Sequence, residues 1–307
     1  MKTAVQTITP VKTPRRRFSL NKKQRLIGWL FLAPSAILIA AMSYYPMVKA
    51  FLLSLKTGVG ANLHWTGFTN YGRLLQDSVF IQSIKNTFIY LIIEVPVMLL
   101  LALILASMLN DRRLRFRGMF RTLIFLPCAT SLVSYALIFR SLFAADGFIN
   151  TILIKLGIIN TGYAFLTYAN SARAVIIIAL IWRWTGYNMV FYLAGLQNID
   201  YSLYEAARID GASPLQCLWK ITIPLLKPII LLTAIMSTNG TLQLFDESWN
   251  LTQGGPGNAT ITMSHYIYNL AFRYFPNIGY ACAVSYVIFI MVAILALVQL
   301  KVGDKRE

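Results

Sequence analysis

The sequence predicts an all-α integral membrane protein, a bundle of six transmembrane helices. Of its 307 residues, 57% are hydrophobic and only 13% are charged, whereas soluble domains hold about 45–50% apolar and roughly 25% charged residues. The mean hydropathy of +0.60 excludes an intrinsically disordered chain, which needs low hydrophobicity. Six apolar stretches decide the fold class, because about 20 residues at 1.5 Å each cross the roughly 30 Å hydrocarbon core of a bilayer.

The first three spans are read directly from these stretches. Leu26 to Val48 gives 23 residues without a charge, and a cleavable signal peptide would have a shorter apolar region, so we expect an uncleaved first span. The second span runs from about Asn86 to Leu109 and is interrupted by Glu94. The third is Thr122 to Phe139.

The last three spans follow the same rule. The fourth runs from about Ala174 to Ile199 and contains Arg183, the fifth from about Ile223 to Phe245, and the sixth from Tyr280 to Leu300. The long connections 49–85, 140–173 and 246–279 are expected to fold against the membrane surface or an external partner.

The basic residues orient these spans. The formal net charge is +17, and six spans put both termini on one side. That side holds 19 of the 28 Lys and Arg residues, the other side holds 8, and Arg183 lies within a span. The excess predicts cytoplasmic termini and explains the charge better than nucleic-acid binding does. The predicted organisation is a basic tail at 1–25, expected to be disordered, a first helix and outer loop at 26–85, a five-helix core at 86–300, and a cytoplasmic tail at 301–307.

Recognisable catalytic motifs are absent from the sequence. It contains no GxxxxGK[ST] phosphate-binding loop, and His64 and His265 lack an HExxH context. The three cysteines are too scattered for a metal site or a disulfide framework. We therefore predict no catalytic residue, no metal and no cofactor in this chain, and a role other than that of an enzyme.

The loop 200–224 is the most informative segment. A short helix through Ala206 and Ala207 is predicted to end at Gly211, which tolerates positive φ. Ser213 would cap a second helix with Pro214 at its first position. Pro224 is expected to stop that helix before the fifth span.

This loop resembles the EAA motif of ABC importer permeases, EAA-x3-G-x9-I-x-L-P. The matching residues are Glu205-Ala206-Ala207, Gly211, Ile221 and Ile223-Pro224, with Ile in the usual Leu place. Further segments resemble sugar-importer permeases of the maltose-transport MalF type: 30–34, 45–46, 86–87, 125–127, 193–197 and 251–256.

The resemblance implies the type I ABC importer permease fold and a place in the cytoplasmic (inner) membrane. It also implies four kinds of partner: a second homologous permease, two ATPase subunits that bind ATP and Mg, an extracytoplasmic solute-binding protein, and membrane lipid. The loop would dock on one ATPase through seven residues: Glu205, Ala206, Ala207, Asp210, Gly211, Ile221 and Pro224.

Polar and aromatic residues within two spans predict a substrate path. Trp184, Tyr187, Asn188 and Phe191 fall on one face of the fourth span, which suits the apolar faces and hydroxyls of a sugar, although such a face also packs helices. Polar residues crowd the outer half of the fifth span, where they usually face a cavity. The candidates for the path are Tyr187, Asn188, Ser237, Asn239 and Thr241.

Two charges lie inside the predicted spans. Glu94 is 9 residues beyond Lys85 and Arg183 is 10 beyond Arg173, which places both about 14–15 Å deep. A charge at that depth costs on the order of 2.5–3.5 kcal/mol, so we expect the two to pair or to share one polar cavity. Each facing water independently is the alternative.

Four functions are compared with these features, and they fit unequally. The leading one is an ATP-driven, binding-protein-dependent importer of a mono- or oligosaccharide. A polyol or glycerol-phosphate importer is the nearest alternative, although phosphate normally attracts several Arg or Lys and only Arg183 lies deep in the membrane. An ion-coupled secondary transporter with Glu94 as proton relay would not need the 200–224 loop, and a membrane enzyme lacks a catalytic constellation.

Overall fold

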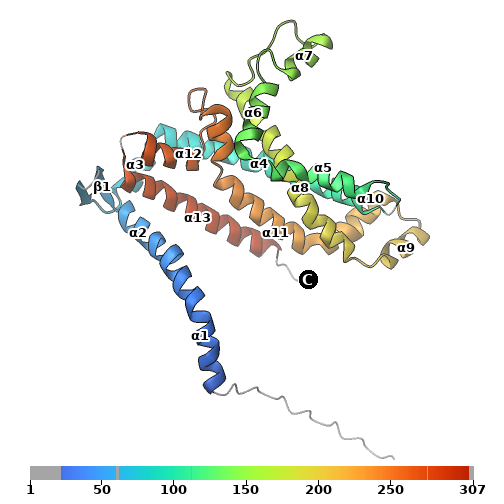
Figure 1. The fold of residues 1–307 in the computed structure, drawn as a ribbon, viewed down its shortest axis with the longest axis horizontal. Helices are drawn as coiled ribbons and strands as arrows, with labels where there is room; N and C mark the ends of the chain where they lie inside the picture. The colour runs from blue at the N-terminus through green and yellow to red at the C-terminus, as the bar shows by residue number, and fades with distance from the viewer. Residues whose placement is uncertain (1–21, 60–61, 112, 275, 304–307) are drawn as a thin grey trace, which may run out of the picture. The chain divides into compact units, whose positions relative to one another are not determined.

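The computed structural model describes residues 22–59, 62–111, 113–274 and 276–303, and most of these residues are helical (Figure 1). Five of the described helical stretches are long and apolar enough to span a membrane: Gln24–Ser54, Ser78–Asn110, Ala169–Gln197, Pro214–Leu242 and Ile278–Gly303. They correspond to the predicted first, second, fourth, fifth and sixth spans. The predicted all-α membrane fold is confirmed. Most of the predicted tails, at 1–21 and 304–307, lies outside the described residues.

The chain divides into two compact units, Met1–Lys49 and Ala50–Glu307. The described part of the first unit holds α1 (Lys22–Ile39), a π-helical segment η1 (Ala40–Tyr44) and the start of α2 (Tyr45–Ser54). The π-helical segment ends just before Pro46. Proline has no backbone N–H to donate, and its ring clashes with the carbonyl group one turn earlier in an α-helix. The wider turn lets the helix continue past this proline.

The predicted third span is a broken helix. It consists of α5 (Arg117–Ala129) and α6 (Leu132–Leu142), which meet at an angle of 98°. Pro127 removes one helical hydrogen bond, and Thr130 and Ser131 take extended conformations with ψ of 148° and 136°. The predicted span from Thr122 to Phe139 therefore consists of parts of two helices with a break at Thr130 and Ser131.

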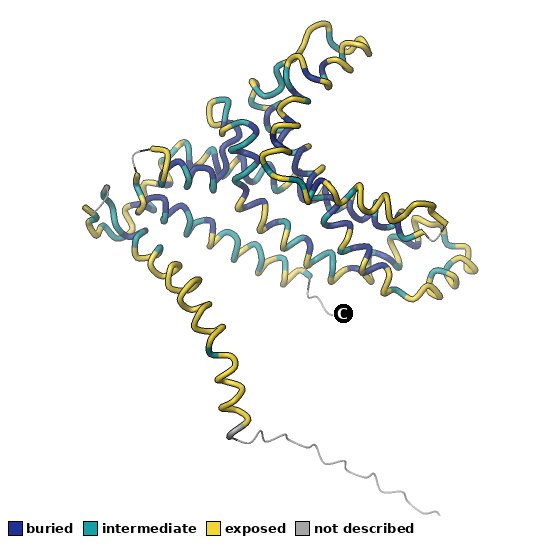
Figure 2. The backbone as a smooth tube through the Cα atoms, in the orientation of Figure 1, coloured by how far each residue is buried: buried dark blue, intermediate teal, exposed yellow. Residues whose placement is uncertain are grey.

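The core of the second unit is built on α4 (Ser78–Asn110) and α8 (Ala169–Gln197), which make the most extensive helix–helix contact. Ala102 and Ala106 on α4 and Ala172 and Ala179 on α8 are fully buried, and small residues allow helices to approach closely in a membrane. Figure 2 shows the buried residues gathered along these helices. Around them pack α11 (Ile223–Leu242) and α13 (Ile278–Gly303).

The three long connections between the spans are structured. A hairpin of β1 (Lys56–Val59) and β2 (Asn62–Trp65) is followed by α3 (Thr69–Leu74). A second connection carries α7 (Phe148–Lys155). The third carries η3 (Ser248–Thr252), α12 (Met263–Tyr268) and η4 (Asn269–Arg273).

One carboxylate ties three of these elements together. Asp77 caps α4 by accepting the backbone N–H groups of Val79 and Phe80, at 2.9 and 3.1 Å. Its other oxygen accepts the hydroxyls of Tyr266 on α12 and Tyr280 on α13, at 2.5 and 2.7 Å. Burial raises the pKa of Asp77, but these four hydrogen bonds together outweigh it and hold that pKa below its ordinary value.

Candidate functional site: the 200–224 loop and a cavity between the helices

The 200–224 loop folds as two short helices joined by a tight turn. The first, α9 (Ser202–Ile209), ends just before Gly211, whose φ is +80°. The second, α10 (Pro214–Cys217), begins with a capping box: Gln216 N–H donates to Ser213 Oγ, and Ser213 N–H donates to Gln216 Oε1. The predicted positions of the glycine turn and of the cap are confirmed.

The second helix does not stop at Pro224. It passes through a π-helical segment, η2 (Leu218–Thr222), directly into α11, so that Pro214–Leu242 is one helical span. Pro224 comes just after this π-helical segment, and the wider turn accommodates a residue that has no N–H to donate. The expectation that this proline ends the helix is wrong, and the loop is continuous with the fifth span.

Side-chain contacts hold the loop together. The hydroxyls of Tyr204 on α9 and Thr222 on η2 lie 2.9 Å apart. Arg208 donates to the Tyr201 hydroxyl at 3.1 Å, and its guanidinium lies 5.7 Å from the centre of that ring. The first helix of the loop is therefore fixed to the base of the fifth span.

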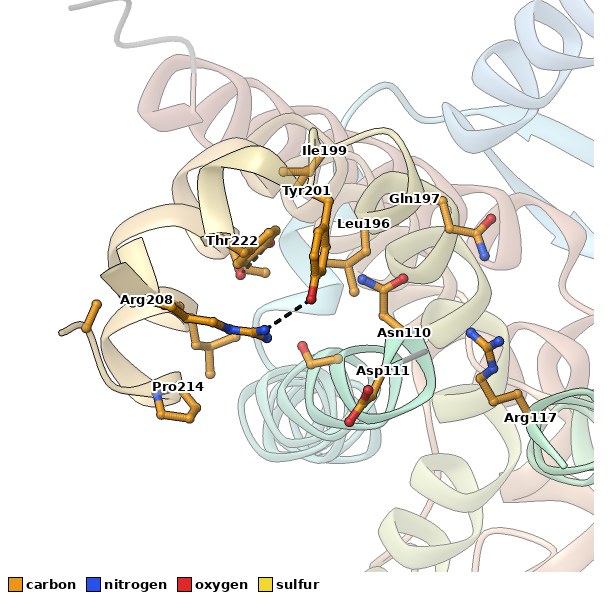
Figure 3. A pocket seen from close by; sticks show the side chains of 15 residues that line it. Asn110, Asp111, Arg117, Leu196, Gln197, Ile199, Tyr201, Arg208, Pro214 and Thr222 are labelled. Atoms are coloured by element: carbon orange, nitrogen blue, oxygen red, sulfur yellow. Dashed lines mark hydrogen bonds between the residues drawn. The ribbon is translucent and has the colours of Figure 1, made fainter. Parts of the chain in front are cut away.

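A hollow separates the loop from the ends of α4 and α8 (Figure 3). Its volume is about 760 Å³, and polar and charged side chains line much of it, including Asn110, Asp111, Arg117, Tyr201 and Arg208. None of the seven predicted docking residues lines this hollow. Glu205, Ala206, Asp210, Gly211 and Pro224 are exposed, while Ala207 and Ile221 are half-buried.

A second cavity, of about 430 Å³, lies between α4, α8 and α11. It brings together four of the five predicted path residues, Tyr187, Asn188, Ser237 and Thr241, from two helices that are distant in sequence. Asn239 does not line it; that side chain is exposed and accepts a hydrogen bond from Gln243. On the aromatic side of the cavity lie Trp184, Tyr187 and Phe245.

Hydrogen bonds connect the polar wall of this cavity across three helices. Thr241 Oγ1 on α11 donates to Glu94 Oε2 on α4 at 2.9 Å. Ser237 Oγ on α11 donates to Asn188 Oδ1 on α8 at 3.5 Å, and Asn188 Nδ2 also lies 3.5 Å from Met98 Sδ on α4. Polar residues of the two predicted helices, α8 and α11, thus contact residues of a third helix, α4.

Glu94 and Arg183 share this cavity but do not form an ion pair within 4 Å. Arg183 Nη2 instead donates to the carbonyl oxygen of Thr130 at 3.3 Å. This carbonyl is at the break between α5 and α6, which frees it from helical bonding. The guanidinium also lies 4.9 Å from the ring centre of Tyr135 and 5.5 Å from that of Trp184. Of the two expectations, the shared polar cavity is the one that the geometry supports.

The sequence interpretation missed two lining residues, Asp246 and Glu247. Both were assigned to the connection that follows the fifth span. The side chain of Glu247 is only 3% exposed. A signal in the sequence could have identified them: two consecutive acidic residues directly follow a polar run in a span, and the whole sequence has only 11 acidic residues.

One buried histidine lies outside this cavity. His265 is buried, its Nδ1 lies 2.8 Å from Ser248 Oγ, and burial lowers its pKa to about 4. Within residues 22–59, 62–111, 113–274 and 276–303, no group of three or more His, Cys, Asp or Glu residues could hold a metal ion.

A match to a known protein family covers both the loop and the cavity. Residues 72–304 match the family described as binding-protein-dependent transport system inner membrane component. The chain belongs to this family. The prediction of an ABC importer permease of the sugar-transport type is confirmed, and the chain is a multi-pass transport component of the inner membrane.

Relatives that align with almost the whole chain are sugar-transport permease proteins. The chain is 51% identical to the lactose transport system permease protein LacF of Rhizobium radiobacter, over 95% of this chain and 98% of that protein. It is 31% identical to the arabinooligosaccharides transport system permease protein AraP of Bacillus subtilis, over 97% and 96%.

Two solved structures share the fold. One is a crystal structure of a bacterial ABC transporter that imports the acidic polysaccharide alginate, with a TM-score of 0.81, 24% identity, and coverage of 92% of this chain and 96% of that one. The other is a bacterial alginate ABC transporter in complex with a pentasaccharide-bound periplasmic protein, with a TM-score of 0.76, 26% identity, and coverage of 92% and 94%.

Proposed function

We propose that this chain is the permease subunit of an ATP-driven importer of lactose or a closely similar neutral oligosaccharide. The observation on which this depends is the 430 Å³ cavity, where aromatic rings face hydroxyl, amide and carboxyl groups. Its volume falls in the range of about 300–1,000 Å³ typical of small-molecule sites. The 51% identity to a lactose permease along 95% of the chain supports the choice of sugar.

The complex we propose contains four kinds of partner. A solute-binding protein delivers the sugar, a second permease completes the cavity wall, and two ATPase subunits bind ATP and Mg²⁺. Both termini lie in the cytoplasm, because the positive-inside excess is on that side. The 200–224 loop then faces the ATPases.

The surface of this loop suits a protein partner. Ile209, Leu215 and Trp219 are 87%, 65% and 62% exposed, and exposed apolar side chains clustered on one loop are typical of an interaction site. Glu205 is exposed beside them on α9. We propose that these side chains, with the seven residues of the EAA-type motif, contact one ATPase.

The continuous helix physically connects the loop to the cavity. Leu218 at the loop and Ser237 at the cavity belong to one helical span, Pro214–Leu242. Nineteen residues at 1.5 Å each separate them by about 28 Å. Because Tyr204 bonds Thr222 at the base of this helix, a displacement of the loop on ATPase closure moves α11 and opens or closes the cavity.

Lactose uptake by the complete transporter tests this proposal. Gly211→Val places a β-branched residue at a φ of +80° in the loop, and Gly157→Val is the matched control at a φ of +70° in a connection between spans. Neither added Cβ would meet an atom within 4 Å. Both variants therefore suffer similar backbone strain of about 1–2 kcal/mol.

We expect ATP-dependent uptake to fall by about tenfold or more in Gly211→Val and by less than about twofold in Gly157→Val, at equal membrane abundance. Equal uptake by the two variants would contradict the coupling role of the loop. Absence of lactose uptake by the unaltered complex would contradict the proposed substrate.

A further inference from the structure

The charges that line the 430 Å³ cavity are unbalanced. Three carboxyl groups, of Glu94, Asp246 and Glu247, face it together with the single guanidinium of Arg183. Glu94 and Glu247 are 2% and 3% exposed. Burial raises the pKa of Glu247 to about 7, so this carboxyl group carries its full charge only above that pH. Once ionised, a group buried to this degree acts strongly on any ligand in the same space, because little water screens it.

Arg183 does not neutralise these carboxylates by direct pairing. It is 6% exposed, and its Nε and Nη1 atoms have no hydrogen-bond partner. Its guanidinium donates a hydrogen bond to a backbone carbonyl, that of Thr130, and the rings of Tyr135 and Trp184 pack against it. Arg183 therefore keeps unused donors beside the cavity while holding the break between α5 and α6.

The carboxyl group of Glu94 also has acceptor capacity left. Glu94 Oε2 accepts one hydrogen bond, from Thr241, although an ionised carboxylate can accept about four. Carboxylate oxygens bind pairs of sugar hydroxyls, and aromatic rings such as Trp184 and Tyr187 offer a surface for the apolar face of a sugar ring. The cavity thus matches a polyhydroxylated ligand that carries no negative charge.

From this geometry we infer that Glu94 and Glu247 determine substrate class: the cavity admits neutral sugars and cationic amino sugars, and it excludes acidic sugars such as uronates, aldonates and sugar phosphates. The inference rests on the proposed function, since it concerns which sugar the same cavity passes. The inference adds that the cavity selects its ligand by charge, and that Glu94 and Glu247 are the two residues responsible.

The charge of the cavity can be measured without transport. In the complete transporter, Ser237→Cys places a thiol on the cavity wall, after Cys128, Cys217 and Cys282 are replaced by Ala. The rates of modification by a cationic reagent (trimethylammonium-ethyl methanethiosulfonate) and an anionic one (sulfonatoethyl methanethiosulfonate) are each divided by the rate with a free thiol.

At pH 8, above the raised pKa of Glu247, we expect the normalised rate to be about tenfold or more higher for the cationic reagent. The ratio should fall toward about 1 when Glu94→Gln and Glu247→Gln are combined. A cysteine at the exposed position Thr151 on α7 is the control, and its ratio should not respond to these two substitutions. A ratio at Ser237→Cys that is near 1 before any neutralisation, or that the substitutions leave unchanged, would overturn the inference.

Sugar protection of the same thiol tests substrate class directly. With the uncharged methyl methanethiosulfonate as reagent, lactose should slow modification of the Ser237→Cys thiol, and lactobionate, its acid analogue, should not. In the double neutralised variant both should protect. Equal protection by the two sugars in the parent complex would contradict the inference.

Two further measurements distinguish failure of this inference from failure of the proposed function. If the double variant does not assemble, Asp246→Asn changes the charge at a half-buried position and should lower the same ratio; no change would count against the inference. Failure of the proposed function appears differently, as no lactose uptake and no lactose protection in the unaltered complex, whatever the rate ratio.

Discussion

Replacing Gly186 by Ala should separate α8 from the broken third span. A Cβ at this position would lie 2.0 Å from the carbonyl oxygen of Ile124 and 3.0 Å from the Cα of Phe125, both backbone atoms of α5. Ordinary van der Waals contact begins near 3.4 Å. The two helices must therefore move apart by about 1.4 Å, the difference between 3.4 and 2.0 Å, because a backbone atom cannot rotate away as a side chain can.

The cost follows from this displacement. Forcing an extra methyl into a packed contact costs about 1–3 kcal/mol, and Gly→Ala in a helix returns up to about 1 kcal/mol of propensity. The same displacement lengthens the bond from Arg183 to Thr130, which is already 3.3 Å long. We expect Gly186→Ala to lower the Tm of the purified complex and its transport rate together.

Gly118→Ala is the matched control. Gly118 lies near the start of α5, and a Cβ there meets nothing within 4 Å. Its thermal unfolding, followed by intrinsic fluorescence, should be unchanged or slightly more stable, which places the two variants about 1–3 kcal/mol apart. If Gly186→Ala unfolds at the same temperature as Gly118→Ala, the close approach of α8 and α5 described here is wrong.

Three further outcomes are expected. Asp77→Asn should lower the Tm of the complex, since the amide cannot accept all four bonds, and hydrogen bonds to a charged group are each worth about 1.5–3 kcal/mol; a Tm equal to that of the parent would contradict this. The pKa of Asp77 is lowered on folding, so its stabilising contribution is present above the unfolded value of 3.8 and is lost as the pH falls through the lower folded value; acid titration should show this loss in the parent and not in Asp77→Asn. Ser213→Ala removes the cap of α10 and should cost about 1 kcal/mol locally, seen as faster amide exchange in the 200–224 loop. Ser131→Ala is the control, because Ser131 is the N-cap residue of α6 but its side chain makes no capping bond, and exchange at the start of α6 should be unaltered.

Composition and local pattern predicted the spans and the loop of this protein well. The crossing helices follow from the lengths of the apolar runs, because each run must satisfy its own backbone hydrogen bonds inside a bilayer. The turn at Gly211 and the cap at Ser213 follow from residues only two positions apart, so their geometry is encoded locally.

Contacts between distant segments could be decided only by the tertiary structure. Thr241, which bonds Glu94, is 147 residues away from it, and Arg183 finds its carbonyl partner 53 residues away, at a helix break that apolar composition does not reveal. Glu247 reaches the cavity because the chain turns inward after α11, although its position in the sequence suggested an outer connection. Local sequence sets which segments become helices, since backbone bonding is local. The depth at which two helices meet, and hence which polar groups share a cavity, depends on side-chain packing summed over several helices.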